Sequence, residues 1–202
     1  MTKPYNPNDK LMHRAHQEGF RARSIYKLQE LDRKFHLIKP HQTVLDLGAA
    51  PGSWLQYICT RIGPSGRALG LDLKPVEPLA TNVTTTVADI TDLAAVETSI
   101  TKAGFDSFNL IISDLAPSTT GIPHADHVRS IELDRAALEI AQKFLRPGGS
   151  LVLKVFPGAN LDSFVQELKE NFTAVKLTKV QSSRDRSNEM YLVCIGKITR
   201  RS

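Results

Sequence analysis

A glycine-rich turn follows a short apolar segment in the first third of the chain. Residues 44–47 are mostly apolar, Gly48 and Gly52 then enclose a proline, and a sequence that can begin a helix starts at Ser53. Glycines permit tight turns and the close approach of a ligand, and the free amides at a helix start attract polar ligand groups. The residues therefore predict a strand, a turn and a helix that together bind a nucleotide-type ligand.

The spacing of these glycines differs from that of dinucleotide-binding proteins. Their fingerprint is G-x-G-x-x-G, whereas Gly48 and Gly52 stand alone with a proline between them, which disfavours NAD. About twenty residues after Gly52, Asp72 closes the apolar segment 68–71, where an acidic side chain can accept hydrogen bonds from ribose hydroxyls. We therefore expect a ligand that contains a ribose.

Three more polar residues lie at the ends of apolar segments. Asp114 ends one segment, Lys154 interrupts another, and Glu189 directly precedes a third. Parallel strands end at the edge where an antiparallel strand begins, so we expect these side chains to share a pocket. A lysine within an apolar strand needs a partner or a pKa below its usual value of about 10.4. The alternatives are an edge lysine that reaches solvent and an aspartate that caps a turn.

Apolar periodicity and turn residues predict the elements that position these side chains. We expect strands near residues 43–47, 68–72, 83–88, 109–113, 150–156, 174–180 and 190–197, and helices near 24–35, 53–62, 93–103, 127–145 and 162–172. The polar stretch 181–189 is too short for a crossover helix, so the last strand must be antiparallel. The predicted fold is α/β: a doubly wound, Rossmann-like, mostly parallel seven-stranded sheet with one reversed edge strand.

Length and charge limit the possible partners. The 202 residues, 41% hydrophobic and 23% charged, predict one domain over 1–202. Residues 1–39 hold nine Lys or Arg and four Asp or Glu, and this difference accounts for the whole net charge of +5. A solvated surface is the simple explanation, but such a segment also suits RNA. No apolar run approaches the ~18 residues of a membrane span, so we expect a cytoplasmic protein without a membrane partner.

Taken together, the motifs strongly resemble those of the FtsJ-type (RrmJ) ribosomal RNA ribose 2′-O-methyltransferases, which use S-adenosylmethionine (SAM). The resemblance covers nearly the whole chain, and it implies the fold of a class I SAM-dependent methyltransferase. It is carried by the segments 21–28, 46–54, 113–117, 147–150, 153–156, 182–184 and 189–191.

The family uses a Lys-Asp-Lys-Glu catalytic quartet. The resemblance places its members on Lys27, Asp114, Lys154 and Glu189, and it is the only basis for including Lys27. Lys154 would accept the proton of the hydroxyl if it is neutral, or stabilise the developing alkoxide if it is charged. Asp114 would orient Lys154, while the other two members position the hydroxyl and the hydrogen bonds of the quartet.

The resemblance also implies the residues that hold SAM. Gly52 and Trp54 would lie beside its methionine part, Asp72 on its ribose, Asp89 near its adenine, and Asp114 would touch it as well. From the residues alone, Trp54 suits the core and Asp89 suits a turn. Ser53 stands where the family commonly has glycine, and its side chain could cap the helix or contact the ligand.

The implied substrate is a uridine of large-subunit ribosomal RNA, in the assembled large ribosomal subunit. Relatives with the same quartet methylate transfer RNA or messenger RNA caps, and the chemistry does not separate these substrates. A non-catalytic ribosome assembly factor is the other alternative, although an intact quartet argues against it. We expect a monomer that contacts RNA phosphates through the basic segment 1–39 and its surroundings. The candidates are Arg21 and Arg23, followed by Lys10, Arg14, Arg184 and Arg186.

No metal is expected. His124, Asp126 and His127 resemble part of a metal site, but no further Cys or His accompanies them.

Overall fold

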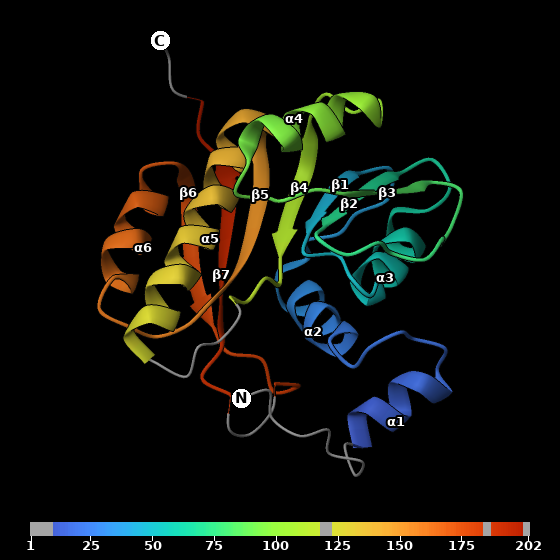
Figure 1. The fold of residues 1–202 in the computed structure, drawn as a ribbon, viewed down its shortest axis with the longest axis horizontal. Helices are drawn as coiled ribbons and strands as arrows, with labels where there is room; N and C mark the ends of the chain where they lie inside the picture. Colours follow the sequence, from blue (N-terminus) through green and yellow to red (C-terminus); the bar gives the residue numbers. More distant parts are fainter. Residues whose placement is uncertain (1–9, 118–122, 184–186, 200–202) are drawn as a thin grey trace.

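A computed structural model describes residues 10–117, 123–183 and 187–199, leaving aside the side chains of 123–127, and contains one seven-stranded sheet (Figure 1). The strands are β1 (Thr43–Leu47), β2 (Arg67–Asp72), β3 (Val83–Val87), β4 (Phe108–Ser113), β5 (Leu145–Val155), β6 (Phe172–Thr178) and β7 (Met190–Lys197). The helices are α1 (Lys10–Gln17), α2 (Ile25–Phe35), α3 (Ser53–Ile62), α4 (Leu93–Lys102), α5 (Pro123–Phe144) and α6 (Leu161–Lys169).

The strand order is β3-β2-β1-β4-β5-β7-β6, and β7 runs in the direction opposite to the other six strands. The predicted mixed sheet with a reversed last strand is therefore confirmed. The expectation that this strand lies at the edge is wrong, because β7 is inserted between β5 and β6. Residues 191–194 of β7 are all buried, whereas in β6 only the end residues Phe172 and Thr178 are buried. A continuously apolar strand suits the interior of a sheet, and a partly polar strand suits its edge.

Most predicted elements agree with the structure within two or three residues, and the exceptions are the starts of α5 and β5 and the whole of α1. Strand β5 begins at Leu145, earlier than predicted, because its pairing with β4 continues past a register shift between Phe108 and Leu110. Helix α1 was not predicted. It docks through Ala15 against Ile25 and Tyr26, so its position depends on tertiary packing.

Helices cover both faces of the sheet (Figure 1). One apolar cluster packs α4, α5 and α6 against the sheet, and a second packs α2 and α3 against the other face. Strand β5 contributes to both, since Leu151 and Leu153 lie in the first cluster and Val152 in the second. The period of two then directs Lys154 to the face that carries α2.

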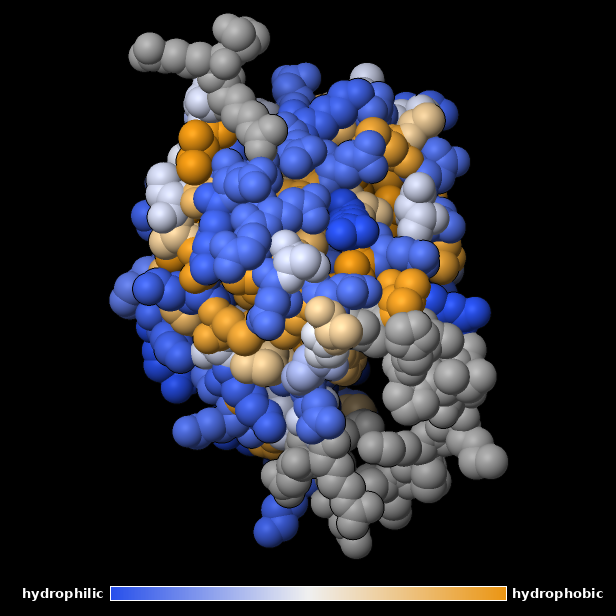
Figure 2. All heavy atoms as spheres, turned by 90° about the vertical axis from the view of Figure 1, so that its left-hand side faces the viewer, coloured by the Kyte–Doolittle hydropathy of each residue, from blue (hydrophilic) through white to orange (hydrophobic). Residues whose placement is uncertain are grey.

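The outer face over α6 and β6 is mostly hydrophilic, with apolar residues in small scattered groups (Figure 2). Groups of this kind are ordinary on protein surfaces. Among the residues that the structure describes, no helix is both long enough and apolar enough to span a membrane.

Candidate active site at the carboxyl edge of the sheet

The turn between β1 and α3 has the glycine geometry that the sequence predicted. Gly48 and Gly52 have φ values of 81° and 102°, a region that side chains with a Cβ rarely adopt. The Asp72 carboxylate at the end of β2 stabilises the turn, because it accepts a hydrogen bond from the Ala50 amide at 2.9 Å. It also accepts one from the Lys74 amide at 2.8 Å, so the two loops at this edge share one carboxylate.

Arg21 fastens this turn to the loop after β2. Its Nη1 donates to the carbonyl oxygens of Pro51 at 3.1 Å and Glu77 at 2.9 Å, and its Nη2 donates to that of Pro78 at 2.8 Å. A Cβ added to Gly52 would lie 2.7 Å from Nη1 of Arg21. The guanidinium therefore leaves no room for a side chain at this position. These donors bind the backbone, and the contact of Arg21 with an RNA phosphate stays a prediction.

Three aspartates make the turn region acidic. Asp46 is only 1% exposed, and its Oδ2 has no hydrogen-bond partner among the described residues. Burial raises the pKa of this carboxyl well above its usual value, and the charges of Asp114 and Asp72 raise it further. This arrangement favours a cationic group at the turn. Sequence reasoning missed Asp46, although an aspartate inside an apolar strand was a signal of the same kind as Lys154.

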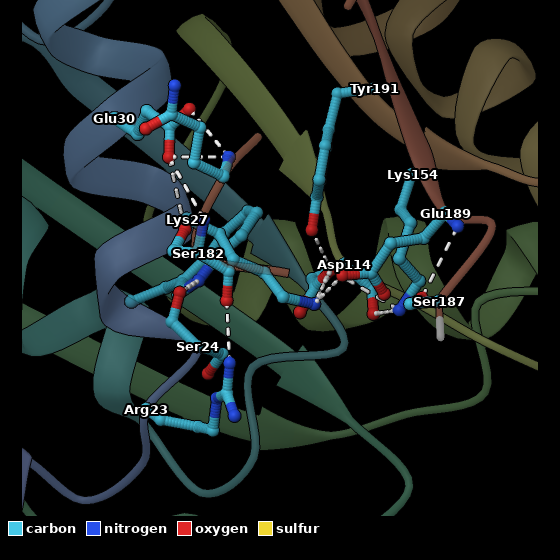
Figure 3. Close-up of polar contacts among 12 residues, drawn as sticks. Arg23, Ser24, Lys27, Glu30, Asp114, Lys154, Ser182, Ser187, Glu189 and Tyr191 are labelled. Atoms are coloured by element: carbon cyan, nitrogen blue, oxygen red, sulfur yellow. Dashed lines mark hydrogen bonds and ion pairs between the residues drawn. The ribbon is translucent and has the colours of Figure 1, made fainter. Parts of the chain in front are cut away.

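The four residues of the predicted quartet come together beside this turn (Figure 3). Nζ of Lys27 lies 2.6 Å from Oε1 of Glu189 and 3.9 Å from Oδ1 of Asp114. Nζ of Lys154 lies 3.3 Å from the same Oδ1 and donates a hydrogen bond to the Asp114 carbonyl oxygen. The four side chains are between 7% and 18% exposed, so each can still meet a substrate. Cations and anions alternate in this cluster.

The charges of the cluster determine the ionisation of Glu189. Burial raises the pKa of this carboxyl, but the hydrogen bond and charge of Lys27, with the charge of Lys154, outweigh it. The resulting pKa lies below the usual value for glutamate, so Glu189 is a stable carboxylate at neutral pH.

Tyr191 is a further member of the cluster that sequence reasoning missed. Its hydroxyl donates to Oδ1 of Asp114 at 2.7 Å, and its burial raises its pKa well above 10, with the charges of Asp114 and Glu189 adding to the effect. Tyr191 pairs with Lys154 across β5 and β7, and directly paired residues present side chains on the same face. The available signal was its position two residues after Glu189.

Trp54 and Ser53 connect α3 to the start of α2. The buried indole of Trp54 donates from Nε1 to the carbonyl oxygen of Ser24 at 2.8 Å, and its ring centroid lies 6.3 Å from that of Tyr191. Trp54 is thus a core residue that borders the cluster, and its contact with a ligand stays a prediction. The Ser53 hydroxyl is buried and lies 2.8 Å from the Ser24 hydroxyl, so it neither caps α3 nor faces the open side of the turn.

Asp89 lies after β3, the strand next to β2. Its carboxylate accepts hydrogen bonds from the amide and hydroxyl of Thr91 at 2.9 and 2.8 Å, which lower its pKa. The residue is exposed and stabilises a turn, as its sequence context indicated. A role near the adenine stays a prediction, with the position of Asp89 at the carboxyl edge in its favour.

Two other arginines of the basic segment also have partners. Arg23 donates from Nη2 to the Ser182 carbonyl oxygen at 2.7 Å, and Arg14 forms an exposed ion pair with Glu18 at 2.8 Å. Arg184 and Arg186 lie outside the described residues, as do the side chains of the histidine pair near residue 125. Among the described side chains, no group of three or more His, Cys, Asp and Glu is arranged to hold a metal ion.

Comparisons with known proteins show which proteins the chain is similar to. A family model described as FtsJ-like methyltransferase matches residues 20–197, which include every predicted site residue. Two proteins named ribosomal RNA large subunit methyltransferase E are 43% identical to the chain. The one from Bdellovibrio bacteriovorus aligns over 194 residues, 96% of this chain and 98% of its own, and the one from Syntrophobacter fumaroxidans over 190 residues, 94% and 95%. A crystal structure described as a ribosomal RNA methyltransferase from Plasmodium falciparum superposes with a TM-score of 0.80 at 29% identity, covering 90% of this chain and 100% of that one.

Proposed function

Because the chain belongs to the FtsJ-like methyltransferase family, we propose that it methylates a ribose 2′-hydroxyl of ribosomal RNA, with SAM as the methyl donor. The observation that carries this proposal is the alternation of Lys27, Glu189, Asp114 and Lys154 at the edge of a glycine turn. Such a cluster can bind a hydroxyl group and stabilise negative charge on its oxygen.

The residues of the turn suit SAM, which carries a positive sulfonium and a positive amino group. Asp46, Asp72 and Asp114 surround the turn, and the pKa of Asp46 is raised partly by the other two charges. A cation at this place would relieve their mutual repulsion. Gly52 allows the chain to turn closely there, and Asp72 lies where an acid can bind ribose hydroxyls. We propose Gly52, Trp54, Asp72, Asp89 and Asp114 as the SAM-binding residues.

When bound, SAM supplies a methyl group on sulfur that a nucleophilic oxygen can accept. The Lys154 ammonium, held by the Asp114 carboxylate and carbonyl oxygens, would donate a hydrogen bond to the 2′-oxygen. This contact stabilises negative charge on the oxygen and eases the loss of its proton to water. Lys27 would hold the same hydroxyl from the opposite side, with Glu189 fixing the position of its ammonium. Tyr191 keeps the Asp114 carboxylate in place.

The proposed substrate is a uridine of large-subunit ribosomal RNA within the assembled large ribosomal subunit, and the proposed enzyme acts as a monomer in the cytoplasm. The names of the two 43% identical relatives support the choice of large-subunit RNA. The excess of positive charge in residues 1–39 supports binding to a phosphate backbone.

The test is methyl transfer from radiolabelled SAM to large ribosomal subunits, free ribosomal RNA or transfer RNA, each from cells that lack the enzyme. We expect label on a ribose of large-subunit RNA. Lys154→Ala should lower kcat by about 10²-fold or more and keep the affinity for SAM. Lys102→Ala, which changes an exposed lysine at the end of α4, is the control. Label on transfer RNA would show that transfer RNA is the substrate instead. SAM binding without label on any RNA would indicate a non-catalytic assembly factor.

A further inference from the structure

Helix α2 presents one polar face to the connection between β6 and β7. Lys27 and Glu30, three residues apart, lie on this face, and Arg23 lies in the turn just before the helix. Figure 3 shows Arg23 and Glu30 directed toward Ser182, and Lys27 directed toward Asp114 and Glu189. The helix that supplies Lys27 therefore also contacts the segment that supplies its partner.

Glu30 makes a cluster of hydrogen bonds with the beginning of this connection. Its Oε1 and Oε2 accept from the Gln181 amide at 2.8 and 3.0 Å, and Oε2 also accepts from the amide and hydroxyl of Ser182 at 3.2 and 3.3 Å. Arg23 binds the Ser182 carbonyl oxygen from the other side. Charge-assisted hydrogen bonds to backbone groups are stronger and more directional than neutral ones. The backbone at Ser182 is thus held at both its donor and its acceptor.

At its other end the connection reaches the active-site cluster. The Glu189 amide donates to the Ser187 hydroxyl at 3.3 Å just before β7 begins, and the Glu189 carboxylate meets Lys27 at 2.6 Å. The described parts of this connection therefore contact α2 at two places, Gln181 and Ser182 at Glu30, and Glu189 at Lys27.

We propose that Glu30 is a positioning residue for the proposed reaction, which holds the β6–β7 connection so that Glu189 meets Lys27. The expected effect of Glu30 on turnover rests on the proposed function. Its expected effect on the contact between Glu189 and Lys27 does not. Glu30 does not touch the reacting groups. It acts through the backbone of Gln181 and Ser182 and then through Glu189.

The charge of Glu30 separates this role from RNA binding. Removal of an acidic side chain makes the surface more positive, so Glu30→Ala should bind RNA equally well or more tightly. A loss of turnover in this variant would therefore come from the geometry of the cluster. A misplacement of about 1 Å at a catalytic group is enough for a large loss of rate.

The first measurement is the pKa of the Glu189 carboxyl group. It is determined by NMR titration in wild type, Glu30→Ala and Glu30→Gln. We expect its pKa to rise in Glu30→Ala, because contact with Lys27 is the largest of the effects that oppose burial. Glu30→Gln should give a smaller change, since its amide oxygen can still accept a backbone hydrogen bond. Glu97→Ala removes a carboxylate of α4 that is paired with Lys143 of α5, and it is the matched control. This variant should leave the Glu189 pKa unchanged. An unchanged Glu189 pKa in both Glu30 variants would overturn the proposal, whether or not the protein methylates RNA.

The second measurement is steady-state methylation. We expect kcat to fall about tenfold in Glu30→Ala, with the KM for SAM within about twofold of wild type. In the Glu189→Gln background the same substitution should have little further effect, because two residues that act through one contact are not additive. Equal losses in both backgrounds would show that Glu30 acts elsewhere and would overturn its link to Glu189. An inactive wild type would instead refute the proposed function, while the NMR result would still decide the role of Glu30.

Discussion

The ammonium of Lys27 lies 2.6 Å from the carboxylate of Glu189, although the two residues come from near opposite ends of the chain. Lys27 is on the second helix, and Glu189 directly precedes the last strand. Because β7 enters the sheet between β5 and β6, its beginning lies at the carboxyl edge beside β5, where α2 also lies. The inserted strand thus brings the last member of the quartet to the first.

This pair predicts the ionisation of Glu189 in a variant without Lys27. In Lys27→Met, burial is no longer opposed by the Lys27 hydrogen bond and charge, so the Glu189 pKa should rise. Glu189 would then become protonated at a higher pH than in the wild type. On acidification, any activity that needs its carboxylate would therefore be lost earlier than in the wild type. NMR titration of the Glu189 carboxyl tests this, with Lys39→Met as the control. A pKa that stays low would show that Lys27 is not its cause.

Gly52→Ala should weaken SAM binding. The φ of 102° strains any L residue, and the new Cβ would lie 2.7 Å from Arg21 Nη1 and 2.9 Å from Val76. We expect at least a tenfold loss of affinity by calorimetry, about 1.4 kcal/mol. Gly63→Ala is the control, because Gly63 also has a positive φ but no atom near the position of its Cβ. That variant should lose about 1 kcal/mol of folding stability and keep its affinity for SAM. Equal affinities in the two variants would contradict crowding at Gly52.

Arg21→Ala should affect SAM binding rather than RNA binding. Its guanidinium joins the glycine turn to the carbonyl oxygens of Glu77 and Pro78, so its loss should weaken SAM binding several-fold. The dependence of RNA affinity on salt should not change, because that slope counts phosphate contacts. Arg14→Ala, in an exposed part of the basic segment, should show the reverse pattern. A weaker dependence of RNA affinity on salt in Arg21→Ala than in wild type would instead indicate that Arg21 contacts an RNA phosphate.

Asp134 predicts a dependence of stability on pH. This α5 residue is 4% exposed, and its Oδ2 has no partner among the described residues. Burial raises its pKa to about 8, against a smaller opposing effect of Lys154. The folded state therefore binds a proton that the unfolded state has released, so this residue lowers the unfolding free energy as pH rises from about 4 to about 8. Asp134→Asn should flatten this dependence and stabilise the protein at pH 8 by about 1–3 kcal/mol. The unfolding free energies of wild type and Asp134→Asn are measured by denaturation between pH 4 and pH 8. The same pH dependence in both proteins would contradict this prediction.

Local sequence was sufficient for the elements and for much of the site. The apolar run around Lys154 and the glycines at Gly48 and Gly52 each carry their signal within a few residues, because strand period and backbone freedom are local properties. The reversal of β7 also followed locally, from a connection too short for a crossover helix. From the residues alone, Lys154, Asp114 and Glu189 were expected in one pocket. Lys27 could be included only through the family resemblance.

Tertiary structure decided the relationships between distant segments. The place of β7 inside the sheet depends on which strand packs most favourably beside β5, and the apolar run of β7 and the polar residues of β6 indicate that order only once the two strands are compared. Arg21 was expected to contact phosphate, but it binds backbone carbonyls that folding brings to it. Glu30 has no distinctive local pattern, because its partners at Gln181 and Ser182 are adjacent only after the sheet has formed. A hydrogen bond between remote segments requires their positions to be set first, and those positions come from packing of the whole core.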